Sequence, residues 1–207
     1  MAKTQRIGPC LWFDNQAEEA ARFYTGIFRK SHILATTRYG TAGFETHHKP
    51  AGTVMTVEFD LDGTRFTALN GGPDFKFNEA VSLQVFCDDQ KEIDYYWDKL
   101  SAGGDPKAQV CGWLKDRYGV SWQVVPRDMA DYFKDEESPG AKRAMEAMLK
   151  MKKMDIAALQ RAYEGSDVDS EEEEPAYTTS GGMTSPKFGA AGSGGAEYEP
   201  GPSRRQK

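Results

Sequence analysis

The sequence contains one pattern of elements twice, and this duplication limits the folds that the chain can adopt. In residues 11–69 a short apolar strand leads into a helix with four apolar residues on one face, Ala20, Phe23, Tyr24 and Ile27. Residues 84–125 repeat the pattern with Ile93, Tyr96, Trp97 and Leu100. Each helix is followed by a hairpin, at 60–66 and at 116–122. We therefore predict an α+β fold of two βαβββ modules whose mixed sheets form a cup around a ligand pocket.

Composition divides the chain into a folded part and a tail. Hydrophobic residues make up 39% of the 207 residues, and they are concentrated before about residue 165. We predict one domain over 5–135, with modules at about 5–73 and 80–126, and a helical extension over 138–164. Residues 165–207 are rich in Gly, Ser and Glu. Because they hold too few apolar residues to repay ordering, we expect a disordered acidic tail.

Charge and cysteine content exclude several classes of partner. The net charge is −6, and the tail holds eight of the 32 acidic residues but four of the 26 basic ones. The folded part has no basic excess, so we expect no nucleic-acid partner. The three cysteines lack C-x-x-C spacing, which argues against a disulfide framework and a zinc site. Residues 1–6 contain no apolar signal, and no run reaches the roughly 20 residues of a membrane span, so we expect a cytoplasmic protein with no membrane partner.

Polar residues mark where the helices begin. Asp14 and Asn15 can cap the helix at about 17–28, while Ser138 and Asp155 precede two further apolar periodic segments. The first module also carries a Gly-rich insertion, residues 40–52, which is either a plain surface loop or a lid over the pocket.

With the paired modules in place, the chain resembles the vicinal oxygen chelate superfamily, which includes glyoxalases, extradiol dioxygenases and antibiotic-resistance proteins. More narrowly it is similar to the PhnB-like group. The resemblance spans about residues 5–164 and rests on segments 11–14, 17–20, 23–24, 66–73, 111–116 and 119–123. It implies a glyoxalase-like fold, and proteins with this type of cup commonly pair as homodimers.

The resemblance also implies positions for a metal, but this sequence places no metal ligand there. Superfamily enzymes hold a divalent cation with His and Glu on the first and last strands of each module. The matching windows, 8–11 and 80–82, contain no His or carboxylate, and the last strands offer Thr67 and Gln123. The adjacent His47 and His48 point to opposite faces on a strand and do not replace these ligands. We therefore expect no metal.

We also expect no nucleotide-type cofactor. Members of the PhnB-like group often carry the name demethylubiquinone methyltransferase. S-adenosylmethionine would favour a Gly-rich turn between a strand and a helix. Here Gly71-Gly72 is followed by Pro73, and Gly103-Gly104 follows a helix.

The preferred interpretation is a small-molecule-binding protein. Its pocket would be formed by six residues: Cys10, Trp12, Thr67, Asn70, Trp113 and Gln123. Strand alternation then turns Thr67 and Gln123 into the cup and packs Phe66 and Trp122 outward, under the helices.

Two alternatives stay open. One is a lyase, isomerase or dioxygenase-type enzyme, for which catalytic residues are unknown and Cys10 is the best candidate. The other is an interaction protein that acts through its tail, where Ser166 and Ser170 each have an acid three residues on and are candidate phosphorylation sites.

Overall fold

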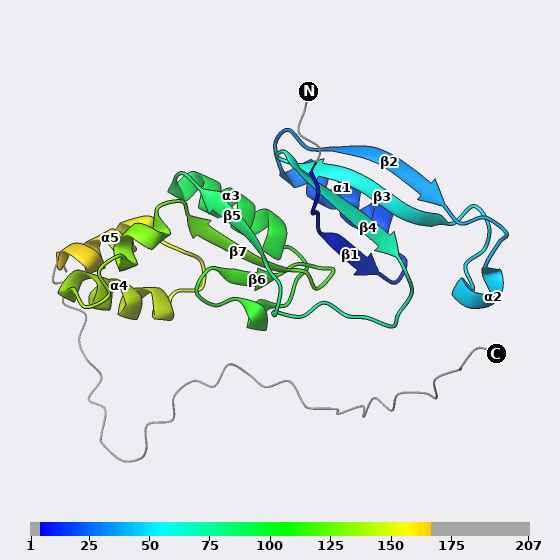
Figure 1. The fold of residues 1–207 in the computed structure, drawn as a ribbon. Coiled ribbons are helices and arrows are strands. Elements are labelled where there is room, and N and C mark those ends of the chain that lie inside the picture. Colours follow the sequence, from blue (N-terminus) through cyan, green and yellow to red (C-terminus); the bar gives the residue numbers. More distant parts are fainter. Residues whose placement is uncertain (1–4, 167–207) are drawn as a thin grey trace, which may run out of the picture. The chain divides into compact units, whose positions relative to one another are not determined.

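The first module is a four-stranded mixed sheet with one helix against it (Figure 1). The computed structural model describes residues 5–166. The strand order is β1-β4-β3-β2, in which β1 runs parallel to β4 and the other neighbours are antiparallel. The elements are β1 (Cys10–Phe13), α1 (Ala17–Ile27), β2 (His32–Arg38), α2 (Phe44–His47), β3 (Val54–Leu61) and β4 (Thr64–Asn70).

The second module repeats this topology with one strand fewer. Its sheet has the order β5-β7-β6, again with its first strand parallel to its last. A 3-10 helix, η1, lies where the sequence predicts a strand between α3 and β6. The elements are β5 (Leu83–Cys87), α3 (Gln90–Ser101), η1 (Pro106–Ala108), β6 (Trp113–Lys115) and β7 (Ser121–Pro126). The predicted α+β fold of paired modules is confirmed.

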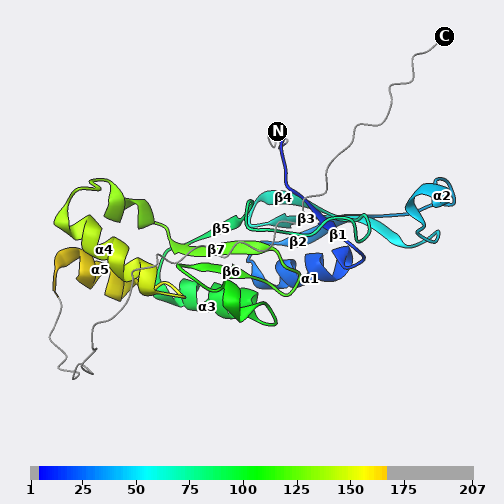
Figure 2. The same ribbon diagram turned by 90° about the horizontal axis from the view of Figure 1, so that it is seen from below.

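Each sheet buries the face that its helix covers, as Figure 2 shows for α1 and α3. Along β3 the residues Val57, Phe59 and Leu61 are buried and their neighbours are half-buried, which is the period of two expected for a strand. Helix α1 contributes its alanines and Tyr24 to the same layer. The core is therefore built from the faces that the sequence pattern predicts.

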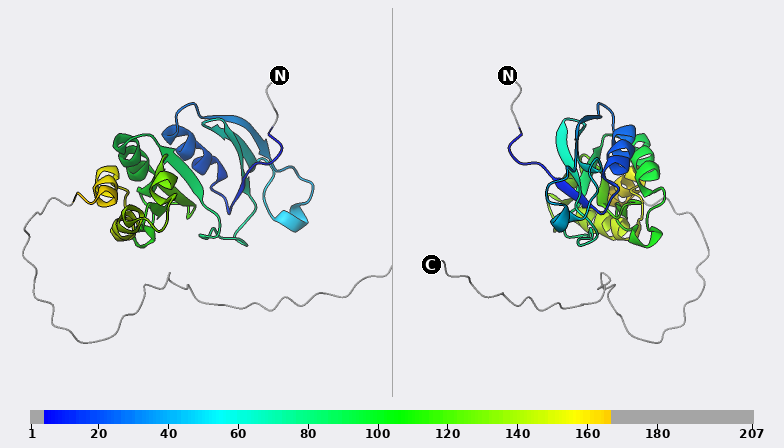
Figure 3. Two further views of the ribbon diagram at one scale, coloured as in Figure 1. Left: turned by 60° about the vertical axis from the view of Figure 1, so that its left-hand side comes forward. Right: turned by 90° about the vertical axis from the view of Figure 1, so that its right-hand side faces the viewer.

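Aromatic side chains join the two modules, and α1 lies beside α3 (Figure 3). Phe28, just after α1, stacks on Tyr96 at 5.1 Å and on Trp122 at 5.5 Å between ring centroids. The hydroxyl of Tyr95 donates a 3.0 Å hydrogen bond to the carbonyl oxygen of Ile27. These contacts connect the end of the first helix to the second module.

Two helices follow the second sheet, as the sequence predicts. They are preceded by a 3-10 helix, and the three elements are η2 (Met129–Phe133), α4 (Pro139–Lys150) and α5 (Ile156–Glu164). Asp155 Oδ1 accepts the amide hydrogen of Ala158, so the predicted cap at Asp155 forms, and Ser138 Oγ accepts that of Ala141 and caps α4. By contacts the chain divides into residues 1–168 and 169–207, and the described residues belong to the first unit. The predicted tail beyond residue 166 lies outside the described residues.

Two local predictions differ from the structure. The cap of α1 does not come from Asp14 or Asn15, because its N-cap residue is Gln16 and makes no side-chain cap bond. Asn70 on β4 supplies the cap instead, with Oδ1 accepting the amide hydrogen of Ala17 at 2.8 Å. The Gly-rich insertion is not wholly loop, because it contains the short helix α2. The residues that flank this helix, Gly43 and His48, both have a left-handed backbone, with φ angles of 82° and 52°.

Candidate functional site

The predicted register of the two last strands is confirmed. Phe66 and Trp122 are 6% and 2% exposed and pack in the helix-covered layer, whereas Thr67 and Gln123 are half-buried. Thr67 and Gln123 therefore lie on the opposite face, which α1 and α3 leave uncovered. We call this the open face of each sheet.

On each open face one residue of the first strand pairs with one residue of the last. Cys10 lies opposite Thr67 in the first sheet, and Gln84 lies opposite Gln123 in the second. Gln84 therefore occupies in the second sheet the position that Cys10 occupies in the first. The sequence had placed this position within residues 80–82, two residues too early. Gln84 Nε2 donates to Gln123 Oε1 at 3.4 Å, and Gln123 Nε2 donates to Ser82 Oγ at 2.8 Å.

The other predicted pocket residues are held by the protein itself. Asn70 is 3% exposed, and its amide nitrogen donates to the carbonyl oxygen of Val54 at 3.0 Å while its oxygen caps α1. Trp12 is half-buried and donates from Nε1 to the carbonyl oxygen of Gly72 at 2.9 Å. Trp113 is half-buried and lies opposite Gln123 on β6. A ligand could therefore contact the partly exposed side chains of Trp12 and Trp113, but not the buried side chain of Asn70.

The donors on the open faces do not fit a divalent cation. Thr67, Gln84 and Gln123 offer neutral oxygens, which bind such ions weakly without a carboxylate or imidazole beside them. Cys10 is exposed, but partial burial raises the pKa of its thiol, so the metal-binding thiolate is disfavoured. Within residues 5–166 no three His, Cys, Asp or Glu side chains gather in a way that could hold a metal.

His47 has a structural environment in the insertion. Its ring lies 4.4 Å from the ring of Tyr39, and Nδ1 accepts the amide hydrogen of Lys49 at 3.0 Å. The tilted ring contact and this hydrogen bond fold the insertion back on the end of β2.

Among the helices of the described segment, none is both long and apolar enough to cross a membrane.

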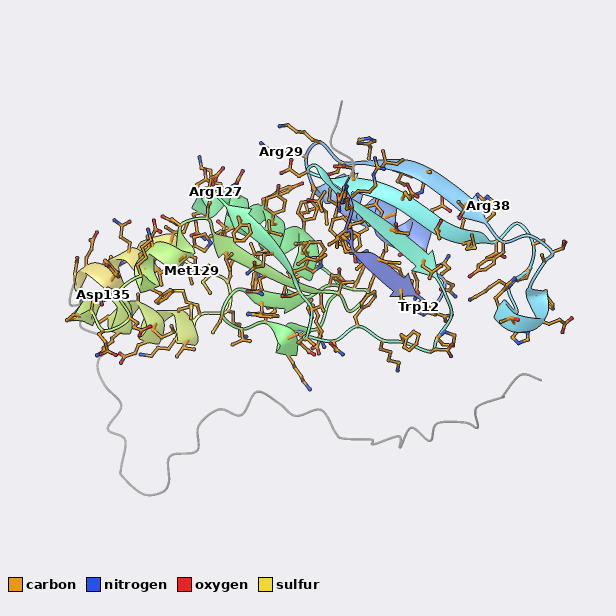
Figure 4. All side chains as sticks on the ribbon, viewed as in Figure 1. Trp12, Arg29, Arg38, Arg127, Met129 and Asp135 are labelled. Carbon is orange, nitrogen blue, oxygen red and sulfur yellow. The ribbon has the colours of Figure 1, made fainter. Side chains whose placement is uncertain are left out.

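The structure contains a cavity at a place that the sequence did not predict, which we call the seam cavity. Its volume is about 620 Å³, and it lies between the β3–β4 hairpin with the end of α1 and the β5 strand with α3. Figure 4 labels two of its lining residues, Arg29 from the first module and Arg127 from the second. Gln84 lines it, whereas Cys10, Thr67 and Gln123 do not. Because the lining comes from separate segments, no single motif marks it.

The family model that matches residues 5–125 is described as 3-demethylubiquinone-9 3-methyltransferase. The PhnB protein of Bacillus cereus is 36% identical, with a TM-score of 0.50, and the match covers 59% of this chain and 99% of that one. No match is found among curated proteins.

Two further structures have lower similarity. A Pseudomonas aeruginosa protein is 21% identical, with a TM-score of 0.45 and coverage of 58% of this chain and 96% of that one. The fosfomycin resistance protein FosX of Listeria monocytogenes, with Mn(II), is 14% identical, with a TM-score of 0.40 and coverage of 63% and 95%. The family model spans more than half of this chain, and the Bacillus cereus protein is matched over nearly its whole length. The chain therefore belongs to the family described as 3-demethylubiquinone-9 3-methyltransferase, which is the PhnB-like group of the vicinal oxygen chelate superfamily.

Proposed function

We propose that this protein binds a small organic molecule on the open faces of its sheets, at positions where superfamily enzymes hold a metal. The observation that carries the proposal is the set of paired residues at those positions, Cys10 with Thr67 and Gln84 with Gln123. All four side chains are uncharged while the thiol stays protonated, and they are half-buried or exposed on one face. Such groups orient a ligand through hydrogen bonds, and Trp12 and Trp113 add apolar contact surface.

A methyltransferase activity, as the family description would suggest, has less support. S-adenosylmethionine would favour backbone amides of a Gly-rich turn at the start of a helix. The turn at Gly71 leads to Pro73, and α1 begins after Gln16 with its first amide bound by Asn70. We therefore propose binding rather than methyl transfer.

We further propose that the protein is a homodimer in which a second copy covers the open faces. Phe86 shares its face of β5 with Gln84 and is 49% exposed, a large apolar surface for an aromatic side chain. A second copy over this face would bury Phe86 and enclose the paired residues. Native mass spectrometry measures this directly, and a monomer at micromolar concentration would contradict it.

The binding proposal is tested on freshly purified protein by native mass spectrometry together with metal analysis. We expect a bound organic mass, or binding from a panel of small organic molecules, that the double variant Thr67→Ala/Gln123→Ala loses. Thr36→Ala, an exposed change on β2, is the matched control and should keep the ligand. Stoichiometric metal that disappears in Gln123→Ala would overturn the proposal.

A further inference from the structure

The seam cavity has an aromatic wall whose rings pack on one another. Phe28 stacks nearly parallel on both Tyr96 and Trp122, with interplanar angles of 24° in each pair. Phe66 stacks on Phe59 at 5.5 Å, and both Phe66 and Trp122 are buried. Phe28, Tyr96, Trp122 and Phe66 all line the cavity; Phe28 and Tyr96 are half-buried and present aromatic surface to it, whereas Phe66 and Trp122 are 6% and 2% exposed. Aromatic groups of a ligand can make edge-to-face or offset contacts with such a wall.

The charged residues around the cavity differ in whether they already have partners. The carboxylate of Asp88 accepts a hydrogen bond from Arg127 Nε, and the two form an ion pair. Glu92 Oε2 accepts the amide hydrogen of Asp88 at 2.9 Å, at the start of α3. Three of the six lining charges are therefore engaged with one another or with the backbone.

The cavity is lined by three cations and three carboxylates, but the cations differ in whether they have an ion-pair partner. Arg29 and Lys30 follow α1, and neither lies within 4.0 Å of a carboxylate in the part of the chain that the structure describes. Among the lining carboxylates, Asp62 in the hairpin and Glu92 make no ion pair within residues 5–166, whereas Asp88 does. Arg29 and Lys30 are adjacent in sequence and neither has an ion-pair partner among the described residues, so they offer a local positive site for an anionic group on a ligand.

Tyr96 adds a hydrogen-bond donor. Its hydroxyl has no hydrogen-bond partner within residues 5–166, although the ring lines the cavity. Partial burial, and then the nearby carboxylates of Glu92 and Asp62, raise the pKa of Tyr96, so the hydroxyl stays protonated at neutral pH. A protonated hydroxyl beside an aromatic wall can donate to an oxygen of a bound molecule.

We propose that the seam cavity is a binding site for an aromatic small molecule that carries one acidic group. The rings would lie against the exposed parts of Phe28 and Tyr96, the acidic group would lie toward Arg29 and Lys30, and the Tyr96 hydroxyl would donate a hydrogen bond. A cavity of about 620 Å³ is large enough for two or three fused or linked rings. Gln84 belongs both to this cavity and to the open face of the second sheet, but the contacts proposed here use none of the four paired residues of the open faces and do not depend on ligand binding there.

The test uses two fluorescent probes of the same shape, 1-anilinonaphthalene-8-sulfonate and neutral N-phenyl-1-naphthylamine, on the full chain. We expect the sulfonate to saturate at one molecule per chain and to bind more tightly than the neutral probe. Arg29→Gln/Lys30→Gln should weaken the sulfonate about fivefold and leave the neutral probe unchanged, since each exposed charge contributes modestly. Tyr96→Phe should weaken the sulfonate about threefold.

Two control variants locate the probes. Lys99→Gln/Lys107→Gln removes the same charge from exposed positions outside the cavity and should change neither affinity. Thr64→Trp fills the cavity from an exposed strand position and should abolish binding of both probes, whereas Thr36→Trp, on β2 outside it, should not. The proposal is overturned if the sulfonate does not saturate, if both charge variants weaken it equally, or if it binds Thr64→Trp as it binds the parent chain.

Discussion

The hydroxyl of Tyr24, on α1, donates a 2.8 Å hydrogen bond to Oδ2 of Asp116 in the second module. The same oxygen accepts from Trp122 Nε1 at 2.8 Å. The other oxygen, Oδ1, accepts the amide hydrogens of Tyr118 and Val120 at 2.8 and 3.0 Å. Asp116 is 2% exposed, so four donors from both modules satisfy one buried carboxylate.

Asp116→Asn should destabilise the fold strongly. An amide nitrogen would face the donors of Tyr24 and Trp122, and the indole N–H of Trp122 would lose its acceptor in a buried site. We expect the free energy of unfolding to fall by about 3 kcal/mol in urea denaturation, with an unchanged m-value. Tyr24→Phe removes one of the four bonds and should cost about 1 kcal/mol. A loss below about 0.5 kcal/mol for Asp116→Asn would show that the network does not hold the modules together.

Asn70→Ala should lower stability because it removes the cap of α1 and the partner of the Val54 carbonyl oxygen. We expect a loss of about 2 kcal/mol, which corresponds to a fall of roughly 4–8 °C in Tm for a folded part of this size. Asn70→Asp keeps the cap acceptor but not the donor, so its Tm should lie between those of Asn70→Ala and the parent chain. If Asn70→Ala leaves Tm unchanged and abolishes ligand binding, Asn70 acts as the pocket residue that the sequence predicted.

Two glycines should respond oppositely to alanine. A Cβ atom at Gly104 would overlap the carbonyl oxygen of Lys115, which is backbone and cannot rotate away. Gly104→Ala should therefore cost about 2 kcal/mol or more. A methyl group on Gly26, in α1, would meet no atom of another described element within 4 Å, so Gly26→Ala should stabilise by about 0.5–1 kcal/mol through its helix propensity. Differential scanning calorimetry of both variants checks the opposite signs.

The thiols should differ in their rates of alkylation. Cys87 is 1% exposed, and burial, together with the nearby carboxylates of Glu92 and Asp88, raises its pKa to about 12. Cys10 is exposed, with a thiol pKa raised by partial burial. Iodoacetamide should therefore modify Cys10 first and leave Cys87 intact below about pH 10.

The alkylation rate at Cys10 should keep rising as pH increases through about 9, because the thiolate is the reactive form and a raised pKa delays its formation. Mass spectrometry of peptides over a pH range of about 7–10 measures both rates. A rate at Cys10 that reaches its plateau below about pH 8 would instead indicate an activated thiolate and would favour the enzyme alternative.

Removal of residues 167–207 should leave the described part unchanged. Residues 165–207 are expected to be a tail separate from the domain over 5–135 and the helices over 138–164, and Ser170 lies outside the described residues. We expect urea midpoints within the error of the parent chain and unchanged probe binding at the seam cavity. A loss above about 1 kcal/mol would contradict this domain division.

The sequence by itself determined the main helices, most of the strands and the faces that they bury, but not the short helices η1 and α2. Buried residues recur every two positions in β3 and about every 3.6 positions in α1, and these patterns can be seen within a short stretch of sequence. The caps at Ser138 and Asp155 are also local, because each side chain binds an amide three residues further on. The same local patterns placed Thr67 and Gln123 on the faces that the helices leave uncovered. The family could also be recognised, because its motifs follow in order along the chain.

Only the tertiary structure decided which distant groups meet. Asn70 caps a helix that begins 53 residues earlier, and Asp116 binds a hydroxyl 92 residues away. Register made Gln84 the counterpart of Cys10, and the seam cavity exists because two modules leave space between a hairpin and a strand. Such contacts depend on how the packed layers fit together in three dimensions. No periodic pattern or residue spacing in the sequence indicates that fit.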